Sequence, residues 1–100
     1  MILAEVGYNA EGKLTAFTVQ NHGDSYVCSA VSMLVINTIN SIETLTGQQF
    51  DCDVNEEGVS IKFSLTAPRE SGAGVLLDAM LLGLRSVCEQ YPDEINLKEM

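Results

Sequence analysis

The chain's only histidine lies six residues before a cysteine, in the stretch QNHGDSYVCS that covers residues 20–29. A thiolate is a strong nucleophile, and an imidazole within hydrogen-bond reach can take the thiol's proton and hold the two groups as an ion pair. His22 and Cys28 are therefore candidates for covalent catalysis. Gly23 can turn the chain back toward the cysteine, so the intervening loop permits the two side chains to meet.

The segment after the histidine is predicted to be a helix over residues 28–46. It contains no Pro or Gly, and its apolar residues recur every three or four positions. Asp24 and Ser25 are candidate N-cap residues, and Gly47 stands where a helix commonly ends. Cys28 would then lie in the first turn, where backbone N–H groups and the helix dipole stabilise a negative charge.

The other two cysteines have simpler interpretations. Cys52 shares a predicted strand face with Phe50 and Val54, so we expect a core thiol whose pKa is raised by the neighbouring aspartates 51 and 53. Cys88 lies on an apolar helical stripe and is expected to be a small buried side chain. Three widely spaced cysteines without a C-x-x-C pair indicate neither a disulfide framework nor a zinc site.

The surrounding pattern predicts the element order ββαββαβ. Residues 2–9 and 13–20 form a first hairpin, with Leu14, Ala16, Thr18 and Gln20 on one side of its second strand. Residues 50–54 and 59–65 alternate as a second hairpin around the turn NEEG. A second helix runs from an N-cap at Ser71 to Tyr91, before Pro92, and residues 94–98 add a short edge strand. These elements predict an α+β two-layer sandwich, a single domain over residues 1–100 with both helices on one face of a mixed or antiparallel sheet.

Apolar side chains surround the axis of the second helix, where Asp78 is the only charged residue between Ala73 and Leu84. One sheet face cannot cover them all, and the uncharged stretch is shorter than the roughly 18 to 20 residues of a membrane span. A twofold homodimer contact is the simplest second surface, and an exposed binding groove is the alternative.

The charge balance narrows the choice of partners. Fourteen acidic and five basic residues give a formal charge of −9 and a pI near 4.2. Such a chain repels nucleic acid and attracts basic peptides, although solubility alone explains the charge as well. The first ten residues lack the pattern of a signal peptide, so we expect a cytoplasmic protein.

The string VQNHGDSYVCSAVSMLVINTINSIETL resembles the ribosomal-processing cysteine protease family, Prp. The family pattern has a His at the end of the second strand, a loop, then Cys-[AS]-[AG]-[VA]-S and a long helix. Here CSAVS supplies Cys28 to Ser32, and the ending EQYPDEINL is similar to that of the family. Asn21 stands where Gly commonly precedes the histidine, and the loop is short.

The resemblance implies a cysteine endopeptidase that removes a short N-terminal extension from large-subunit ribosomal protein twenty-seven. The cut would follow an apolar stretch that ends in an aromatic residue. It also implies a homodimer with two helices and one sheet, and a reaction that requires no cofactor or metal. The basic N-terminal segment of a ribosomal protein is then the expected partner.

In such a site His22 and Cys28 form the catalytic pair. Backbone N–H groups at the helix start are the natural oxyanion-hole donors. The residues expected to support the pair or the oxyanion hole are Ser29, Ser32 and Asp24, with Asp24 more simply a helix cap. The residues expected to form a substrate-binding loop are Asn21, Gly23, Ser25 and Tyr26.

Two other classes compete with the protease. A non-catalytic, ribosome-associated module of the same fold would bind a peptide beside the first helix without cutting it. A thiol redox or metal protein would need a second cysteine near Cys28, and the sequence places none close to it.

Overall fold

Five strands and two helices follow one another in the predicted order ββαββαβ. The computed structural model describes residues 1–20, 26–55 and 60–99. The elements are β1 (Ile2–Tyr8), β2 (Leu14–Gln20), α1 (Tyr26–Leu45), β3 (Phe50–Asn55), β4 (Ser60–Leu65), α2 (Ser71–Gln90) and β5 (Ile95–Glu99).

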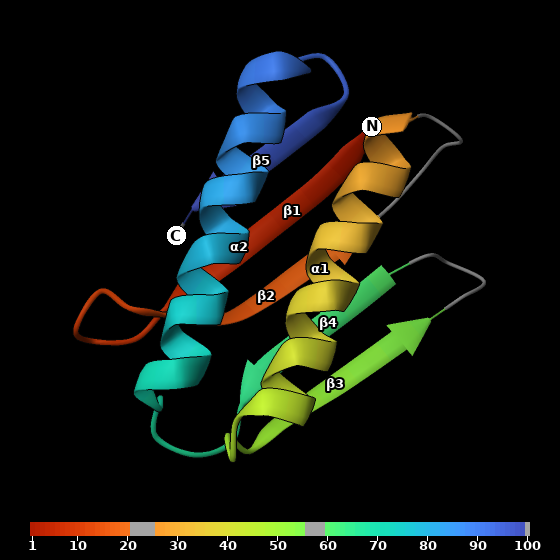
Figure 1. Ribbon diagram of the computed structural model, residues 1–100. Coiled ribbons are helices and arrows are strands. Elements are labelled where there is room, and N and C mark those ends of the chain that lie inside the picture. Colours follow the sequence, from red (N-terminus) through yellow and green to blue (C-terminus); the bar gives the residue numbers. More distant parts are fainter. Residues whose placement is uncertain (21–25, 56–59, 100) are drawn as a thin grey trace.

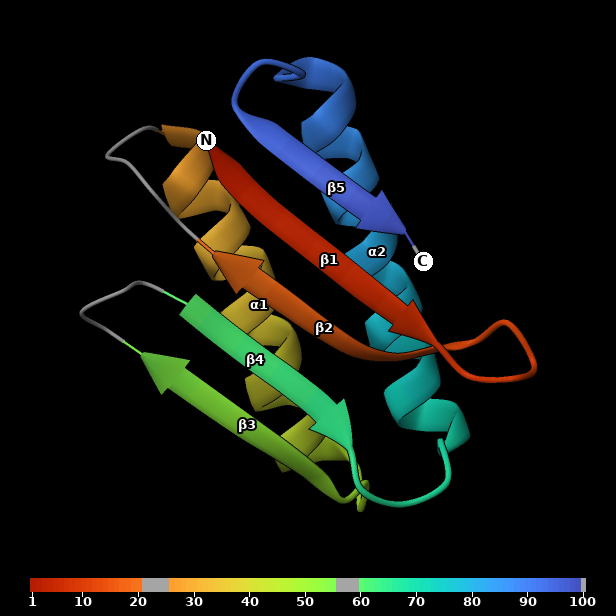
Figure 2. The ribbon, with the colours of Figure 1, turned by 180° about the vertical axis from the view of Figure 1, so that it is seen from behind.

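The strands form one sheet in the order β3-β4-β2-β1-β5. Neighbours are antiparallel except for β5, which runs parallel to β1 and gives the sheet its mixed character. Both helices lie on the same face (Figure 1), and seen from behind the sheet has no described element over it (Figure 2). The two-layer α+β sandwich is thus confirmed, with an open second face.

The first hairpin contains a bulge that the alternation did not predict. Gly12 adopts a left-handed φ of 77° in its turn, and the backbone N–H of Asn9 donates to the carbonyl of Lys13 at 2.8 Å. Leu14 then pairs with Tyr8, whereas Ala16 pairs with Gly7. Because one residue is inserted between these pairs, Leu14 returns to the core and is only 1% exposed. Our assignment of Leu14 to the face of Ala16 and Thr18 was therefore wrong.

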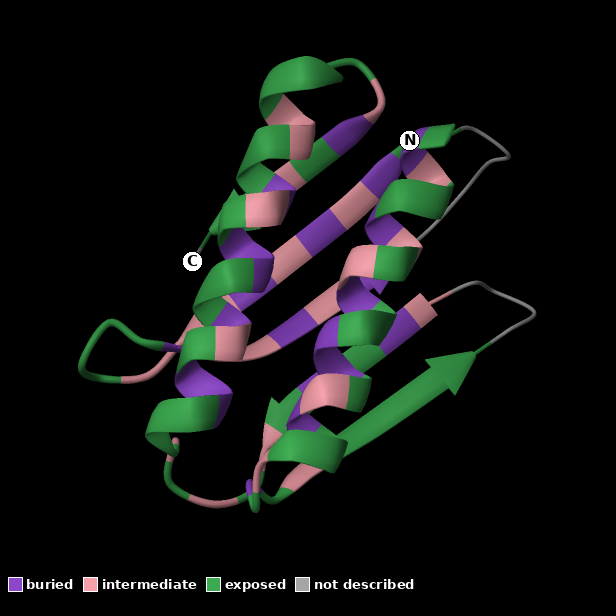
Figure 3. Ribbon diagram, viewed as in Figure 1, coloured by how far each residue is buried: buried purple, intermediate pink, exposed green. Residues whose placement is uncertain are grey.

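The core lies between the sheet and the helices. Buried residues of both helices face the strands (Figure 3), and Phe63 stacks on Phe17 and on Phe50 with ring centroids 4.9 and 5.0 Å apart. The β-branched side chains of Val31, Val35 and Ile42 are wholly buried on α1. Their burial stabilises a helix whose intrinsic propensity is modest.

Two predicted helix ends differ in detail. Gly47 follows α1 but has no positive φ. The last turn is instead closed by Thr46, whose backbone N–H and hydroxyl both donate to the carbonyl of Ile42. At α2, Ser71 is the first helical residue, and the cap position belongs to Glu70, which makes no side-chain cap hydrogen bond.

A buried glutamine replaces the missing cap of α2. Gln48 is 6% exposed, and its Oε1 accepts a hydrogen bond of 2.7 Å from the backbone N–H of Glu70. Its Nε2 donates to three carbonyls, those of Gln49, Ala67 and Pro68. One side chain therefore joins the end of α1 to the start of α2.

Part of the apolar surface of α2 is covered by α1 rather than by the sheet. The helices approach so closely at Gly83 that a Cβ there would lie 2.7 Å from Cδ2 of Leu34. Val75 and Leu82 nevertheless remain 68% and 63% exposed. Both helices are long and apolar enough to cross a membrane by composition, but each packs one face on the sheet. The homodimer contact expected on α2 stays a prediction.

Candidate active site

The end of β2 and the start of α1 lie at the same end of the sheet. Gln20, the last residue of β2, pairs with Leu3 of β1 and with Ser60 at the start of β4. The first turn of α1 lies over this end (Figure 1). Residues 21–25 join the two elements and lie outside the described residues. In the sequence His22 follows Gln20 by two residues. The end of β2 is therefore the starting point of the segment that carries His22.

Cys28 is the third residue of α1, which begins at Tyr26. The expected position in the first turn is therefore confirmed, although the helix starts two residues earlier than predicted. The thiol-bearing residue is half-buried and packs against the core. The first turn carries no acidic side chain. Its backbone N–H groups and the positive end of the helix dipole thus favour an anion at this place.

Cys28 lies on the flank of α1 that faces away from α2. Successive residues of an α-helix turn by about 100°, which puts Cys28, Ser32 and Glu43 on one flank of α1 and Leu34 on the other. Leu34 meets α2 at Gly83. Glu43 lies close enough to Cys52 of β3 for its charge to raise the pKa of that thiol. The flank of Cys28 accordingly borders the outer part of the sheet.

Strand β3 forms an exposed ledge beside this flank. Cys52 and Val54 pair with Phe63 and Ile61 and share their face of the sheet. Phe63 and Ile61 are buried, whereas Cys52 is exposed and Val54 is 52% exposed. This strand is exposed along most of its length (Figure 3). We call the helix-facing side of β3, formed by Cys52 and Val54, the β3 ledge.

The prediction of Cys52 as a core thiol was therefore wrong. Strand alternation identified the correct face, but no helix covers that face at β3. Partial burial raises the pKa of the Cys52 thiol most, and the charges of Asp53 and Glu43 raise it further. Cys88 is half-buried, and burial raises its thiol pKa as well, partly offset by a backbone hydrogen bond at Leu97.

The remaining predicted residues are placed only in part. Tyr26, at the first position of α1, is 94% exposed. Ser29 is exposed and is turned about 100° from Cys28, whereas Ser32 is half-buried one turn further along the same flank. Asn21, His22, Gly23, Asp24 and Ser25 lie outside the described residues. In the described ranges no group of His, Cys, Asp or Glu could hold a metal ion.

Sequence reasoning missed which flank of α1 borders the outer strands of the sheet. Ile36, which is 42% exposed, and Glu43 lie on the side of α1 that borders the β3 ledge. The sequence shows that these residues share a flank of the helix with Cys28. It does not show which flank faces β3, because that depends on the side of α1 on which α2 packs.

The fold of two helices over an open five-strand sheet is shared with solved protease structures. A crystal structure of the essential ribosomal processing protease Prp from Staphylococcus aureus, in complex with a covalently linked product peptide, matches with a TM-score of 0.93 and 26% identity over the whole of both chains. The structure of SMU.848 from Streptococcus mutans matches with a TM-score of 0.89 and 26% identity, over 100% of this chain and 94% of that one. The fold is that of a two-helix, five-strand cysteine protease.

Sequence comparison agrees with the structural likeness. The family model described as Cysteine protease Prp matches residues 1–96. The ribosomal processing cysteine protease Prp of Staphylococcus aureus strain Mu50 is 26% identical over 97% of both chains. The Prp of Bacillus subtilis strain 168 is 26% identical over 76% of this chain and 71% of its own. The chain belongs to the Prp family of ribosomal processing cysteine proteases.

Proposed function

We propose that this protease removes an N-terminal extension from large-subunit ribosomal protein twenty-seven, with Cys28 as nucleophile and His22 as general acid and base. The observation that supports it most is the position of Cys28 in the first turn of α1, beside the end of the strand that leads to His22. The covalently linked product peptide in the Staphylococcus aureus relative fits a thiol that bonds to its substrate.

The reaction follows from that position. Sγ of Cys28 attacks the scissile carbonyl carbon, and His22, which has taken the thiol proton, returns it to the leaving amine as the C–N bond breaks. Water then cleaves the thioester and regenerates the thiol. Backbone N–H groups of the first turn of α1 stabilise the oxyanion because they are held where negative charge develops.

The β3 ledge is the proposed resting place of the substrate chain. Val54 and Ile36 offer exposed apolar surface on the two sides of the strip between β3 and α1. An extended peptide that runs beside α1 with its scissile bond at Cys28 would place apolar side chains on this strip. The acidic character of the chain supports a basic ribosomal segment as substrate.

The decisive experiment uses a peptide that copies the extended N-terminus of ribosomal protein twenty-seven from the same organism. The wild-type chain should release two fragments that mass spectrometry identifies. Cys28→Ser should lower kcat/KM by at least about 10⁴-fold, because the nucleophile is lost. His22→Ala should lower it by about 10²- to 10⁴-fold, the usual contribution of a general base.

Cys88→Ser is the matched control, because Cys88 lies on α2 and half-buried against the core. It should cut at nearly the wild-type rate. Peptide binding by Cys28→Ser, measured by fluorescence anisotropy, should persist while cleavage is lost. If Cys28→Ser cuts as fast as wild type, Cys28 is not the nucleophile and the proposed dyad is wrong.

The non-catalytic binding module remains the competing function. It predicts that the wild-type chain binds the extension peptide without releasing fragments. It also predicts that Cys28→Ser complements loss of the wild-type gene in cells. Cleavage by the wild type together with failed complementation by Cys28→Ser would exclude it.

A further inference from the structure

The β3 ledge connects the two ends of α1. Strand β3 runs back along the helix, because only residues 46–49 join the end of α1 to the start of β3. At the other end of the strand Asn55 pairs with Ser60, which also pairs with Gln20 at the end of β2. The ledge therefore leads from the end of the sheet where α1 begins, with Cys28, to the end where α1 stops (Figure 1).

Glu43 lies at the far end of this path. It is exposed in the last turns of α1, and the helical rotation of about 100° per residue puts it on the same flank as Cys28 and Ile36. Its charge reaches the exposed Cys52 of the β3 ledge and raises the pKa of that thiol. At about 1.5 Å per residue, Glu43 lies roughly 22 Å along the helix axis from Cys28.

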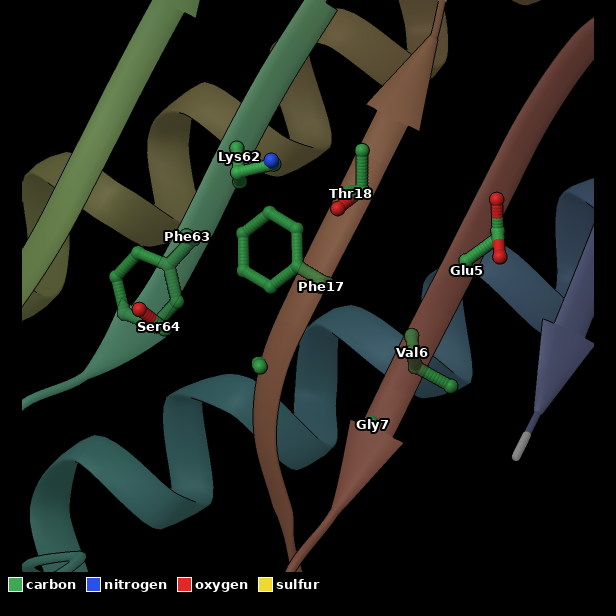
Figure 4. A pocket seen from close by; sticks show the side chains of 9 residues that line it. Glu5, Val6, Gly7, Phe17, Thr18, Lys62, Phe63 and Ser64 are labelled. Carbon is green, nitrogen blue, oxygen red and sulfur yellow. The ribbon is translucent and has the colours of Figure 1, made fainter.

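The two aspartates of β3 belong to the opposite face of the sheet. Asp51 and Asp53 pair with Ser64 and Lys62 of β4, and directly paired residues share a face. Ser64 and Lys62 line a shallow hollow on the side of the sheet away from the helices (Figure 4). Both α1 and β3 are described over their whole length, and Glu43 is their one acidic residue on the helix side.

No cation of the chain balances the charge of Glu43 within the described ranges. The ion pairs there each involve an arginine that lies on α2 or just before it, and neither pair includes Glu43. The exposed apolar side chains of Ile36 and Val54 lie between Glu43 and Cys28. A ligand that covers these apolar residues would bring its next side chain to an unpaired carboxylate, which favours a positive charge there.

The length of the path determines which substrate residue reaches Glu43. An extended peptide advances about 3.3 Å per residue, so roughly six or seven residues cover the distance of roughly 22 Å from Cys28. The proposed substrate places the stretch before its cut on this path. We propose that Glu43 selects substrates that carry a lysine or arginine about six or seven positions before the scissile bond. This inference rests on the proposed function and adds a charged determinant to the apolar ones.

The test uses the extension peptide with every basic residue replaced by glutamine and a single lysine returned at one position before the cut. The wild-type chain should show its highest kcat/KM with lysine at position six or seven. The gain over the other positions should be about threefold or more, the size expected of one exposed ion pair. It should appear as a lower KM with an unchanged kcat, because the pair forms far from the reacting atoms.

Charge reversal separates a local pair from the general attraction of an acidic chain for lysine. Glu43→Gln should abolish the positional preference. Glu43→Lys should reverse it, so that a peptide with glutamate at the selected position is cut better than one with lysine. Glu89→Gln is the matched control, because it changes the net charge equally at the exposed end of α2 and should keep the preference. Circular dichroism confirms that each variant is folded.

Alkylation follows the path without cleavage. In Cys28→Ser at alkaline pH, saturation with the preferred peptide should slow the labelling of Cys52 by about threefold or more, because the peptide covers the β3 ledge. Cys88 lies on α2 and should label at the same rate with and without peptide. Peptide mapping by mass spectrometry gives both rates.

The outcomes distinguish this inference from the proposed function. Cleavage that does not depend on the position of the lysine, or a preference that persists in Glu43→Gln, overturns the role of Glu43 and leaves the protease intact. Equal labelling of Cys52 with and without bound peptide overturns the path along the β3 ledge. Peptides that are neither bound nor cut would overturn the proposed function, and this inference with it.

Discussion

The three cysteines differ because of where the fold puts them, and residue type alone would not separate them. Cys28 lies in the first turn of α1 on the flank that borders β3. Cys52 is exposed on the β3 ledge, and Cys88 is half-buried on α2. Burial and nearby carboxylates raise the thiol pKa of Cys52, and burial raises that of Cys88. Neither residue is suited to act as a thiolate near neutral pH.

This difference predicts a selective pH response to alkylation. At neutral pH Cys52 and Cys88 should react with iodoacetamide more slowly than a free cysteine, because less of each thiol is ionised. As the pH rises toward their raised pKa values, each rate should increase by about tenfold per unit. Peptide mapping by mass spectrometry follows the three sites separately. If the proposed dyad exists, Cys28 labels first and slows in His22→Ala; equal labelling of all three sites would contradict it.

At the scale of the elements, the connections hold the two layers together. Gln48 joins the end of α1 to the start of α2. Arg69, just before α2, donates to the carbonyl of Leu14 at 2.8 Å and forms a 2.7 Å ion pair with Asp78. Both side chains form hydrogen bonds with backbone groups at the ends of helices and strands.

The contribution of Gln48 can be tested by substitution. Gln48→Ala should lower the free energy of unfolding by about 2 kcal/mol, because it leaves a buried N–H and several carbonyls without their partner. Gln48→Glu keeps the acceptor for the N–H of Glu70 but loses the Nε2 donor, and so tests the two sets of bonds separately. Chemical denaturation monitored by circular dichroism gives the values. A loss below about 0.5 kcal/mol for Gln48→Ala would show that the connection is not held by this side chain.

For the whole molecule, net charge and shape decide how partners approach. A chain of charge −9 attracts a basic peptide over a distance that salt controls.

Cleavage should consequently depend on ionic strength. As salt rises from 0.01 M to 0.1 M the Debye length falls from about 30 to about 10 Å, and kcat/KM for a basic substrate peptide should fall by up to about tenfold. The value of kcat should change little, because the encounter is affected rather than the chemistry. A peptide whose lysines are replaced by glutamine is the control. An equal salt dependence for both peptides would exclude electrostatic attraction as the cause.

The sequence by itself determined the local elements and the candidate nucleophile. Period-two alternation in residues 50–54 and 59–65, helical spacing after Cys28 and the turn at Asn9–Gly12 depend on interactions between near neighbours, so they can be read from the chain. The family resemblance and the prediction of Cys28 in a first turn rest on the same local signals. The elements, the family and the position of Cys28 in a first turn were confirmed, and the role of Cys28 as nucleophile stays a prediction.

Only the tertiary structure decided which surfaces are covered. The exposure of Cys52, the return of Leu14 to the core and the flank of α1 that borders β3 depend on where the helices lie over the sheet. Residues far apart in the sequence lie side by side because their strands share one sheet. Burial and cross-strand alignment arise from packing between distant segments, and no local pattern specifies them.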